Sequence, residues 1–169
     1  MGLFSRRPKD ESPDVTNDRA GDGADAGTKL PEDFDGRPVT SPLTDAERDR
    51  IAAGLAALRA RGVDVDDLAA IGAAYDQAFT EARTGRGEGA DVVVETFGIA
   101  IGEYLARHSA REWAVVTDVF GTDLGLVAAR ADTVIVPHNL VGARWMRGET
   151  GWVPGVVTHL ANLRPRPAP

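Results

Sequence analysis

The chain has 169 residues, of which 43% are hydrophobic and 27% charged, as in a single soluble globular domain. The net charge of −7 argues against nucleic acid as a partner, because binding phosphate requires a clustered basic surface. The absence of cysteine excludes disulfides, thiol catalysis and cysteine-ligated metals. No apolar run approaches the ~18 residues that span a bilayer, and the basic N-terminus has no apolar core of a secretory signal after it. We therefore expect a cytoplasmic protein.

Composition divides the chain into three parts. Residues 1–43 are rich in Asp, Gly, Pro and Ser, and their few hydrophobic residues follow no period. Such a segment buries too little apolar surface to offset the entropy lost on ordering, so we predict a disordered acidic tail. Residues 44–163 carry periodic hydrophobic patterns and are expected to form one domain. Residues 164–169 are predicted to be a disordered, Pro-rich end.

The first two predicted elements of the domain are helices. Thr44 with Glu47 three residues later forms a capping box, and Gly62 closes the helix that follows. Asp64 or Asp66 is expected to cap a second helix, whose apolar stripe is Leu68, Ile71, Tyr75 and Phe79. The short connection between the two helices predicts an antiparallel helical hairpin.

A third helix, predicted from Asp91 to about His108, is apolar over so much of its circumference that we expect it at the centre of the fold. Gly98 and Gly102 lie four residues apart on it. This spacing forms a strip of small residues that another element can approach closely. Because each glycine costs roughly 1 kcal/mol of helix propensity relative to alanine, packing must compensate at these positions.

After this helix the hydrophobic period changes from 3.6 to 2. Strands are predicted from Trp113 to Asp118, from Leu124 to Ala128 and from Thr133 to Val136, joined by short turns. Pro137 ends the sheet and begins a short helix to Gly148, and residues 156–163 are expected to form a last helix. The predicted fold class is α+β: N-terminal helices packed on a three-stranded antiparallel meander with a C-terminal helical cap.

Short motifs in the second half resemble a bacterial family known only as a domain of unknown function. They are Phe97-Gly98, Gly102-Glu103, Trp113-Ala114-Val115-Val116-Thr117-Asp118, Gly121-Thr122-Asp123-Leu124, Pro137 with Val141 and Arg144, and Gly148-Glu149. The resemblance covers roughly residues 64–163 and implies a small α+β domain with no established activity. Residues 44–169 contain Arg but no Lys, which is typical of GC-rich codon usage and predicts an actinobacterial source.

One polar set could carry chemistry: Glu103, Asp118, Asp123, His138 and Arg144. In one interpretation the three carboxylates bind a divalent cation or act as an acid–base pair. In the other, which we favour, Asp118 and Asp123 stabilise a turn by accepting backbone N–H bonds, and Glu103 pairs with an arginine such as Arg144.

No other pattern indicates catalysis. His108, His138 and His159 form neither a His-x-x-x-His nor a His-Glu-x-x-His spacing. Ser109 and Thr117 lie outside any Gly-x-Ser-x-Gly elbow. We therefore assign no catalytic residue, no metal and no cofactor.

Trp145, Arg147 and Trp152 could form a partner-binding face, because tryptophan and arginine are enriched in interfaces. Trp152, in the loop Gly151-Trp152-Val153-Pro154, is expected to be the most exposed tryptophan. We therefore favour a non-enzymatic interaction or accessory domain that binds another protein through the C-terminal helix and the Trp152 loop. The alternative is a small metal-binding protein or hydrolase-like enzyme that uses Glu103, Asp118 and Asp123.

Overall fold

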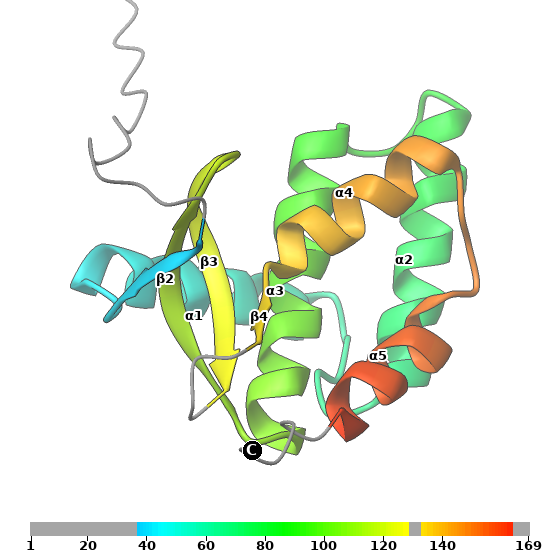
Figure 1. The fold of residues 1–169 in the computed structure, drawn as a ribbon. Coiled ribbons are helices and arrows are strands. Elements are labelled where there is room, and N and C mark those ends of the chain that lie inside the picture. The colour runs from blue at the N-terminus through cyan, green and yellow to red at the C-terminus, as the bar shows by residue number, and fades with distance from the viewer. Residues whose placement is uncertain (1–36, 129–132, 164–169) are drawn as a thin grey trace, which may run out of the picture.

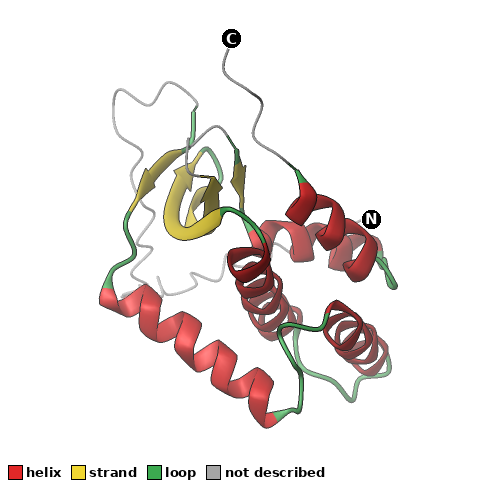
Figure 2. Ribbon diagram, turned by 90° about the horizontal axis from the view of Figure 1, so that it is seen from below, coloured by secondary structure: helices red, strands yellow, loops and turns green. Residues whose placement is uncertain are grey.

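The computed structural model describes residues 37–128 and 133–163. Within these ranges the chain is an α+β domain of five helices and one four-stranded antiparallel sheet (Figure 1). The central helix, residues 90–108, lies between the sheet on one side and the helices 68–83, 137–147 and 153–162 on the other (Figure 1). Figure 2, seen from below, shows the strands gathered at one side of the molecule. Most of the predicted tail (1–36), the Pro-rich end (164–169) and the predicted turn at 130–132 lie outside the described residues.

The first helix, α1 (Asp45–Ala60), begins as its sequence predicts. Thr44 is the N-cap and forms the capping box with Glu47, whose carboxylate also accepts a bond from the Thr44 backbone N–H at 2.7 Å. The helix ends at the C-cap Arg61, and Gly62 follows with a positive φ of 73°, a conformation that glycine adopts without steric cost.

The second helix, α2 (Leu68–Arg83), is capped by a different residue from the two we predicted. The carboxylate of Asp67 accepts bonds from Ala69 N at 2.8 Å and Ala70 N at 3.2 Å. Asp64 lies in the turn before the helix, where its side chain accepts a hydrogen bond from the Asp66 backbone N–H at 2.9 Å. The predicted helical hairpin is also wrong, because α1 and α2 each pack mainly on the third helix rather than on each other.

That third helix, α3 (Ala90–His108), is the packing axis of the domain. Its N-cap is Gly89, two residues before Asp91, from which we predicted the helix. Asp91 lies in the first turn, where a negative charge is favourable. The helix contacts α1, α2, α4, α5, β2 and β3. Nine of its residues are buried: Val93, Thr96, Phe97, Gly98, Ile99, Ala100, Ile101, Gly102 and Leu105.

The two glycines of α3 are sites of close approach, as predicted. A methyl group added at Gly102 would lie 2.0 Å from the Trp113 ring, and one added at Gly98 would lie 2.5 Å from the His138 ring. Alanine at either position would therefore overlap an aromatic ring, and the helix carries glycine there despite its lower propensity.

The sheet has four strands in the order β1-β2-β3-β4, where we predicted three. They are β1 (Val39–Ser41), β2 (Arg111–Asp118), β3 (Gly121–Ala128) and β4 (Val134–Ile135). The additional strand, β1, lies inside the segment assigned to the disordered tail. All three of its residues are exposed, so it carries no burial pattern, and it is held by antiparallel pairing with Val115–Thr117 of β2.

The C-terminal helices are α4 (Pro137–Arg147) and α5 (Val153–Asn162). α4 follows the predicted course and ends at Gly148, which is left-handed with a φ of 70°. α5 begins three residues before the predicted segment, since Pro154 stands in its first turn, where the missing N–H has no intrahelical partner to lose. No helix in residues 37–128 or 133–163 is long and apolar enough to cross a membrane.

Candidate functional site

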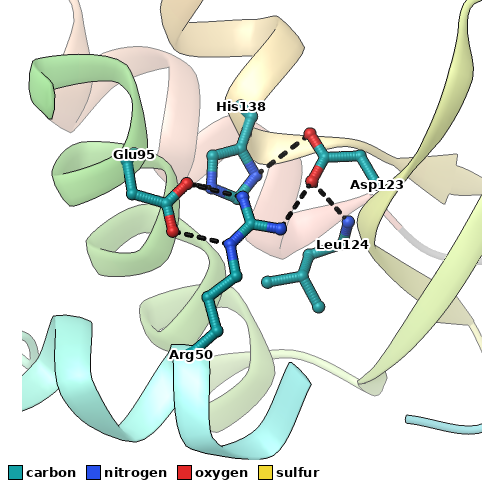
Figure 3. Close-up of polar contacts among 5 residues, drawn as sticks. All are labelled: Arg50, Glu95, Asp123, Leu124 and His138. Atoms are coloured by element: carbon teal, nitrogen blue, oxygen red, sulfur yellow. Dashed lines mark hydrogen bonds and ion pairs between the residues drawn. The ribbon is translucent and has the colours of Figure 1, made fainter. Parts of the chain in front are cut away.

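Four charged or titratable side chains from four separate elements meet at one place. Arg50 comes from α1, Glu95 from α3, Asp123 from β3 and His138 from the first turn of α4 (Figure 3). The elements that supply them are connected through the buried core around α3, so the fold itself positions the four groups. We call them the polar cluster.

Arg50 joins the two carboxylates of the polar cluster. Its Nε and Nη2 donate to the two oxygens of Glu95 at 2.6 and 2.5 Å, and its Nη1 donates to Oδ1 of Asp123 at 3.2 Å (Figure 3). Such forked pairs are geometrically specific as well as strong. The hydrogen bonds with Glu95 raise the pKa of Arg50 and lower the pKa of Glu95.

Asp123 is held from two sides and keeps one oxygen freer than the other. Its Oδ1 accepts from Arg50 and also from its neighbour's backbone, Leu124 N, at 2.7 Å. Its Oδ2 lies 3.6 Å from Nδ1 of His138, beyond hydrogen-bond distance. The side chain as a whole is 31% exposed, and the hydrogen bonds that it accepts from the described residues both go to Oδ1.

His138 is 5% exposed and lies between the two carboxylates. Its Nε2 is 3.2 Å from Oε2 of Glu95, but neither ring nitrogen makes a hydrogen bond of good geometry. Burial lowers the pKa of the imidazole, against the opposing attraction of Asp123 and Glu95. The ring is therefore predominantly neutral at pH 7, with Gly98 on α3 leaving the space that it occupies.

An open groove of about 540 Å³ adjoins the polar cluster. We call it the α4 groove. Its lining is mostly apolar, and two members of the polar cluster, Asp123 and His138, form part of it. It is lined by Val94, Phe120, Asp123, His138, Asn139, Gly142 and Ala143.

The structure brings together two of the five polar residues singled out in the sequence, Asp123 and His138. Arg144 lies elsewhere, with its Nε 3.7 Å from Glu149 and its guanidinium 4.6 Å from the centre of the Trp152 ring. It therefore does not pair with Glu103. The arginine that pairs with Glu103 is Arg107, so the expected carboxylate–arginine pair is present with a different partner.

Glu103 and Asp118 are each engaged in local contacts. Glu103 accepts from Trp113 Nε1 at 3.1 Å and from Arg107 Nε at 2.8 Å. It lies eight residues along α3 from Glu95, or about 12 Å. Asp118 accepts the backbone N–H of Phe120 at 2.7 Å, which is the turn role expected of it. Asp118 is five residues along β2 from Trp113, the hydrogen-bond partner of Glu103, and therefore lies about 17 Å from that contact.

The described residues contain no group of three His, Asp or Glu side chains placed to hold a metal ion. The position between Glu95 and Asp123 is taken by the guanidinium of Arg50. These contacts, with those of Glu103 and Asp118, do not form the shared oxygen site that Ca²⁺ or Mg²⁺ requires.

The predicted partner-binding face is also rearranged. Trp152 is only 8% exposed, so its expected exposure is wrong. Its ring packs edge-on against Tyr75 at 5.5 Å, because the turn after α4 folds back when Gly151 N donates to Asp76 of α2 at 2.9 Å. Trp145 is half-buried against Phe79, and Arg147 is exposed beside Glu149 at 3.1 Å.

Sequence reasoning missed Arg50 and Glu95. Arg50 stands among other charged residues of α1, and Glu95 interrupts the apolar face of α3 between Val94 and Thr96. A carboxylate inside an otherwise apolar helical run was the one available signal, and it was applied to Glu103 instead. Nothing in the local pattern connects Arg50 with a residue 45 positions later.

A family model for a domain of unknown function (DUF3806) matches residues 67–155, which is more than half of the chain. The chain belongs to this family. No curated protein and no solved structure matches the chain. The DUF3806 match includes three members of the polar cluster, Glu95, Asp123 and His138, whereas Arg50 lies before it.

Proposed function

We propose that this DUF3806 chain is a non-enzymatic interaction module of the cytoplasm that binds another protein through the α4 groove. The observation that carries the proposal is Phe120, which is 86% exposed at the tip of the β2–β3 hairpin and lines this groove. A large aromatic side chain in water beside an open apolar wall is the usual form of an interface anchor.

The apolar surface continues along α4. Ala143 lines the groove, and Met146, one helical turn further on, is 85% exposed. Val119, next to Phe120 in the hairpin turn, is 59% exposed. Isolated exposed hydrophobic residues need no explanation. Here Phe120 lines the groove and the other two lie within three residues of a lining residue, and such a grouping favours a contact surface. This surface replaces the Trp152 loop as the proposed contact region. Exposed Arg147, the residue after Met146, remains a candidate beside it, whereas Trp145 packs against Phe79 and Tyr75 of α2.

The alternative, a metal-binding protein or hydrolase that uses Glu103, Asp118 and Asp123, has less support. Glu103 is engaged by Trp113 and Arg107, and Asp118 by the Phe120 backbone. Asp123 is paired with Arg50. Because each carboxylate is engaged by a different partner at a different place, the three are not arranged to share a metal ion or a proton, and we do not propose that role.

The test is affinity capture from the native host with the full chain, followed by mass spectrometry. The wild type is compared with the double variant Phe120→Ser/Met146→Ser. The control is Leu163→Ser, which alters an exposed hydrophobic residue, 42% exposed, at the end of α5. All three proteins must show the same urea midpoint, so that a difference in capture reports the surface and not the fold.

We expect a protein that the wild type and Leu163→Ser both recover and the double variant does not. If the double variant recovers the same proteins as the wild type, the α4 groove is not the contact surface. If purified wild type turns over a substrate in an unbiased hydrolase screen and Asp123→Asn does not, the enzymatic alternative replaces this proposal.

A further inference from the structure

We propose that the α4 groove takes a lysine or arginine side chain of the partner, with its aliphatic stem against the apolar walls and its cationic end at Asp123. This inference rests on the proposed interaction function and specifies the chemistry of the partner at that surface. It follows from the charge of the polar cluster, the free oxygen of Asp123 and the composition of the walls.

The charge of the polar cluster favours a cation. Glu95 and Asp123 contribute two negative charges, Arg50 contributes one positive charge, and a neutral His138 contributes none. One negative charge is therefore left uncompensated beside the groove. Of the two carboxylates only Asp123 lines the groove, so that side chain is where a cation from outside would be recognised.

Asp123 has an oxygen available for such a donor. Its Oδ1 already accepts from Arg50 and from Leu124 N, whereas its Oδ2 faces Nδ1 of His138 at 3.6 Å without a hydrogen bond. A carboxylate oxygen readily accepts two hydrogen bonds. An ammonium or guanidinium donor arriving through the groove would fill this position with a charge-assisted bond.

His138 provides a second, independent observation. It lines the groove and is 5% exposed, and its ring nitrogens lie 3.2 Å from Glu95 and 3.6 Å from Asp123 without a well-aligned hydrogen bond. In either neutral tautomer one nitrogen lone pair faces a carboxylate oxygen, an arrangement of two acceptors without a proton between them. With the proton on Nε2, toward Glu95, the Nδ1 lone pair faces Oδ2 of Asp123, and a cation bound at Oδ2 offsets this repulsion.

The walls suit the stem of a basic side chain. Val94, Phe120 and Ala143 present hydrocarbon to the groove, and Gly142 adds no side chain to it. Lysine and arginine stems pack along such surfaces while their charged ends reach polar groups. An anionic side chain would meet the same walls but would be repelled by Asp123. A purely apolar side chain would bring no hydrogen-bond donor to Oδ2.

Four small probes with similar short alkyl stems separate these cases: n-butylammonium and n-butylguanidinium chloride, n-butanol, and sodium butyrate. Each is titrated into the ¹⁵N-labelled full chain at pH 7.5, and amide shifts of Asp123, Asn139 and Ala143 are followed. We expect saturable shifts with the two cations and dissociation constants at least about fivefold larger for butanol and butyrate. This factor corresponds to the attraction between two opposite unit charges in contact in water, about 1 kcal/mol. Equal or tighter binding of butyrate would overturn the inference.

Two variants locate the charge effect. Asp123→Asn removes the negative charge of the proposed acceptor. It is expected to raise the dissociation constants of the two cations by at least about fivefold and to leave that of butanol unchanged. Because Asp123 also holds Arg50, we add Asn139→Lys, which places a positive charge on an exposed groove residue without altering the polar cluster. Its matched control is Thr158→Lys on the exposed side of α5. Weaker cation binding in Asn139→Lys but not in Thr158→Lys is the expected result, and equal binding in both would contradict the inference.

The charge state of His138 is a separate check. The ¹⁵N shifts of its ring should report a neutral imidazole at pH 7.5 in the free chain. A doubly protonated ring would neutralise the cluster from within and overturn the inference. If captured partners are lost in Phe120→Ser/Met146→Ser but the probes show no preference for cations, the interaction function stands and only this inference fails.

Discussion

Gly98 of α3 and His138 of α4 are fitted to each other: a methyl group at position 98 would lie 2.5 Å from Cδ2 and 2.8 Å from Nε2 of the imidazole. The missing side chain of Gly98 is thus the space in which the His138 ring lies between Glu95 and Asp123. Of the two glycines that the sequence singles out, Gly98 therefore makes room for a member of the polar cluster, whereas Gly102 makes room for Trp113.

Gly98→Ala is therefore expected to destabilise the domain. Alanine would gain up to about 1 kcal/mol of helix propensity, but the overlap with a buried ring costs about 1–3 kcal/mol, so the net change lowers the free energy of unfolding. Urea unfolding followed by circular dichroism measures it. The control is Gly155→Ala in α5, where an added methyl group meets nothing within 4 Å, and which should be neutral or slightly stabilising. A Gly98→Ala midpoint at or above that of the wild type would show that His138 moves aside at no cost.

Truncating Trp152 should reduce stability strongly, whereas truncating Met146 should hardly change it. Trp152 is 8% exposed in the core cluster against Tyr75, so Trp152→Ala is expected to cost about 3–5 kcal/mol of stability. Met146 is 85% exposed, so Met146→Ala should change stability by no more than about 0.5 kcal/mol. The urea midpoints of the two variants check this. Similar losses in both would mean that α4 and the Trp152 turn pack differently from the structure described.

Local patterns predicted the helices, the β2–β3 hairpin and the glycine strip, because each depends on residues a few positions apart. The Thr44–Glu47 capping box and the end of α4 at Gly148 are of this kind. The exposed strand β1 was missed because only its pairing with β2 identifies it. The burial of Trp152 depends on Asp76 of α2, 75 residues before its partner Gly151, and no local pattern contains that contact. The polar cluster depends on four elements meeting, which only the topology determines.

Stability should decline as the pH falls below about 6.5. The pKa of His138 is lowered from 6.5 in the folded protein, so between these two pKa values the unfolded chain binds more protons than the native one. The contribution of neutral His138 is complete above 6.5 and is lost as the pH falls through 6.5 toward the folded value. Glu95, whose pKa is lowered from 4.5 by Arg50, adds a further loss below 4.5. Thermal unfolding midpoints from pH 8 to pH 4 measure both steps.

The first of these two steps should depend on one histidine. His138→Gln is expected to flatten the decline that begins below about pH 6.5, and to lower stability at pH 8 because the buried imidazole contacts are lost. His159→Gln, at an exposed position of α5, should retain the wild-type pH dependence. If both variants keep the decline, another group titrates in that window and His138 is not its source.

Arg50 should control the proton affinity of His138. Its positive charge lowers the pKa of the imidazole, whereas Asp123 and Glu95 raise it. Arg50→Met keeps much of the hydrocarbon stem but removes the guanidinium, leaving two carboxylates beside the ring without their shared partner. We expect the pKa of His138 to rise, measured by the chemical shift of its Cε1 proton against pH, with some loss of stability at neutral pH. Arg48→Met is the control, because Arg48 pairs at 3.0 Å with the fully exposed Asp45 and not with the polar cluster. An unchanged His138 pKa in Arg50→Met would show that solvent already screens the guanidinium from the ring, and the bridge between Glu95 and Asp123 would then be a surface ion pair of little consequence.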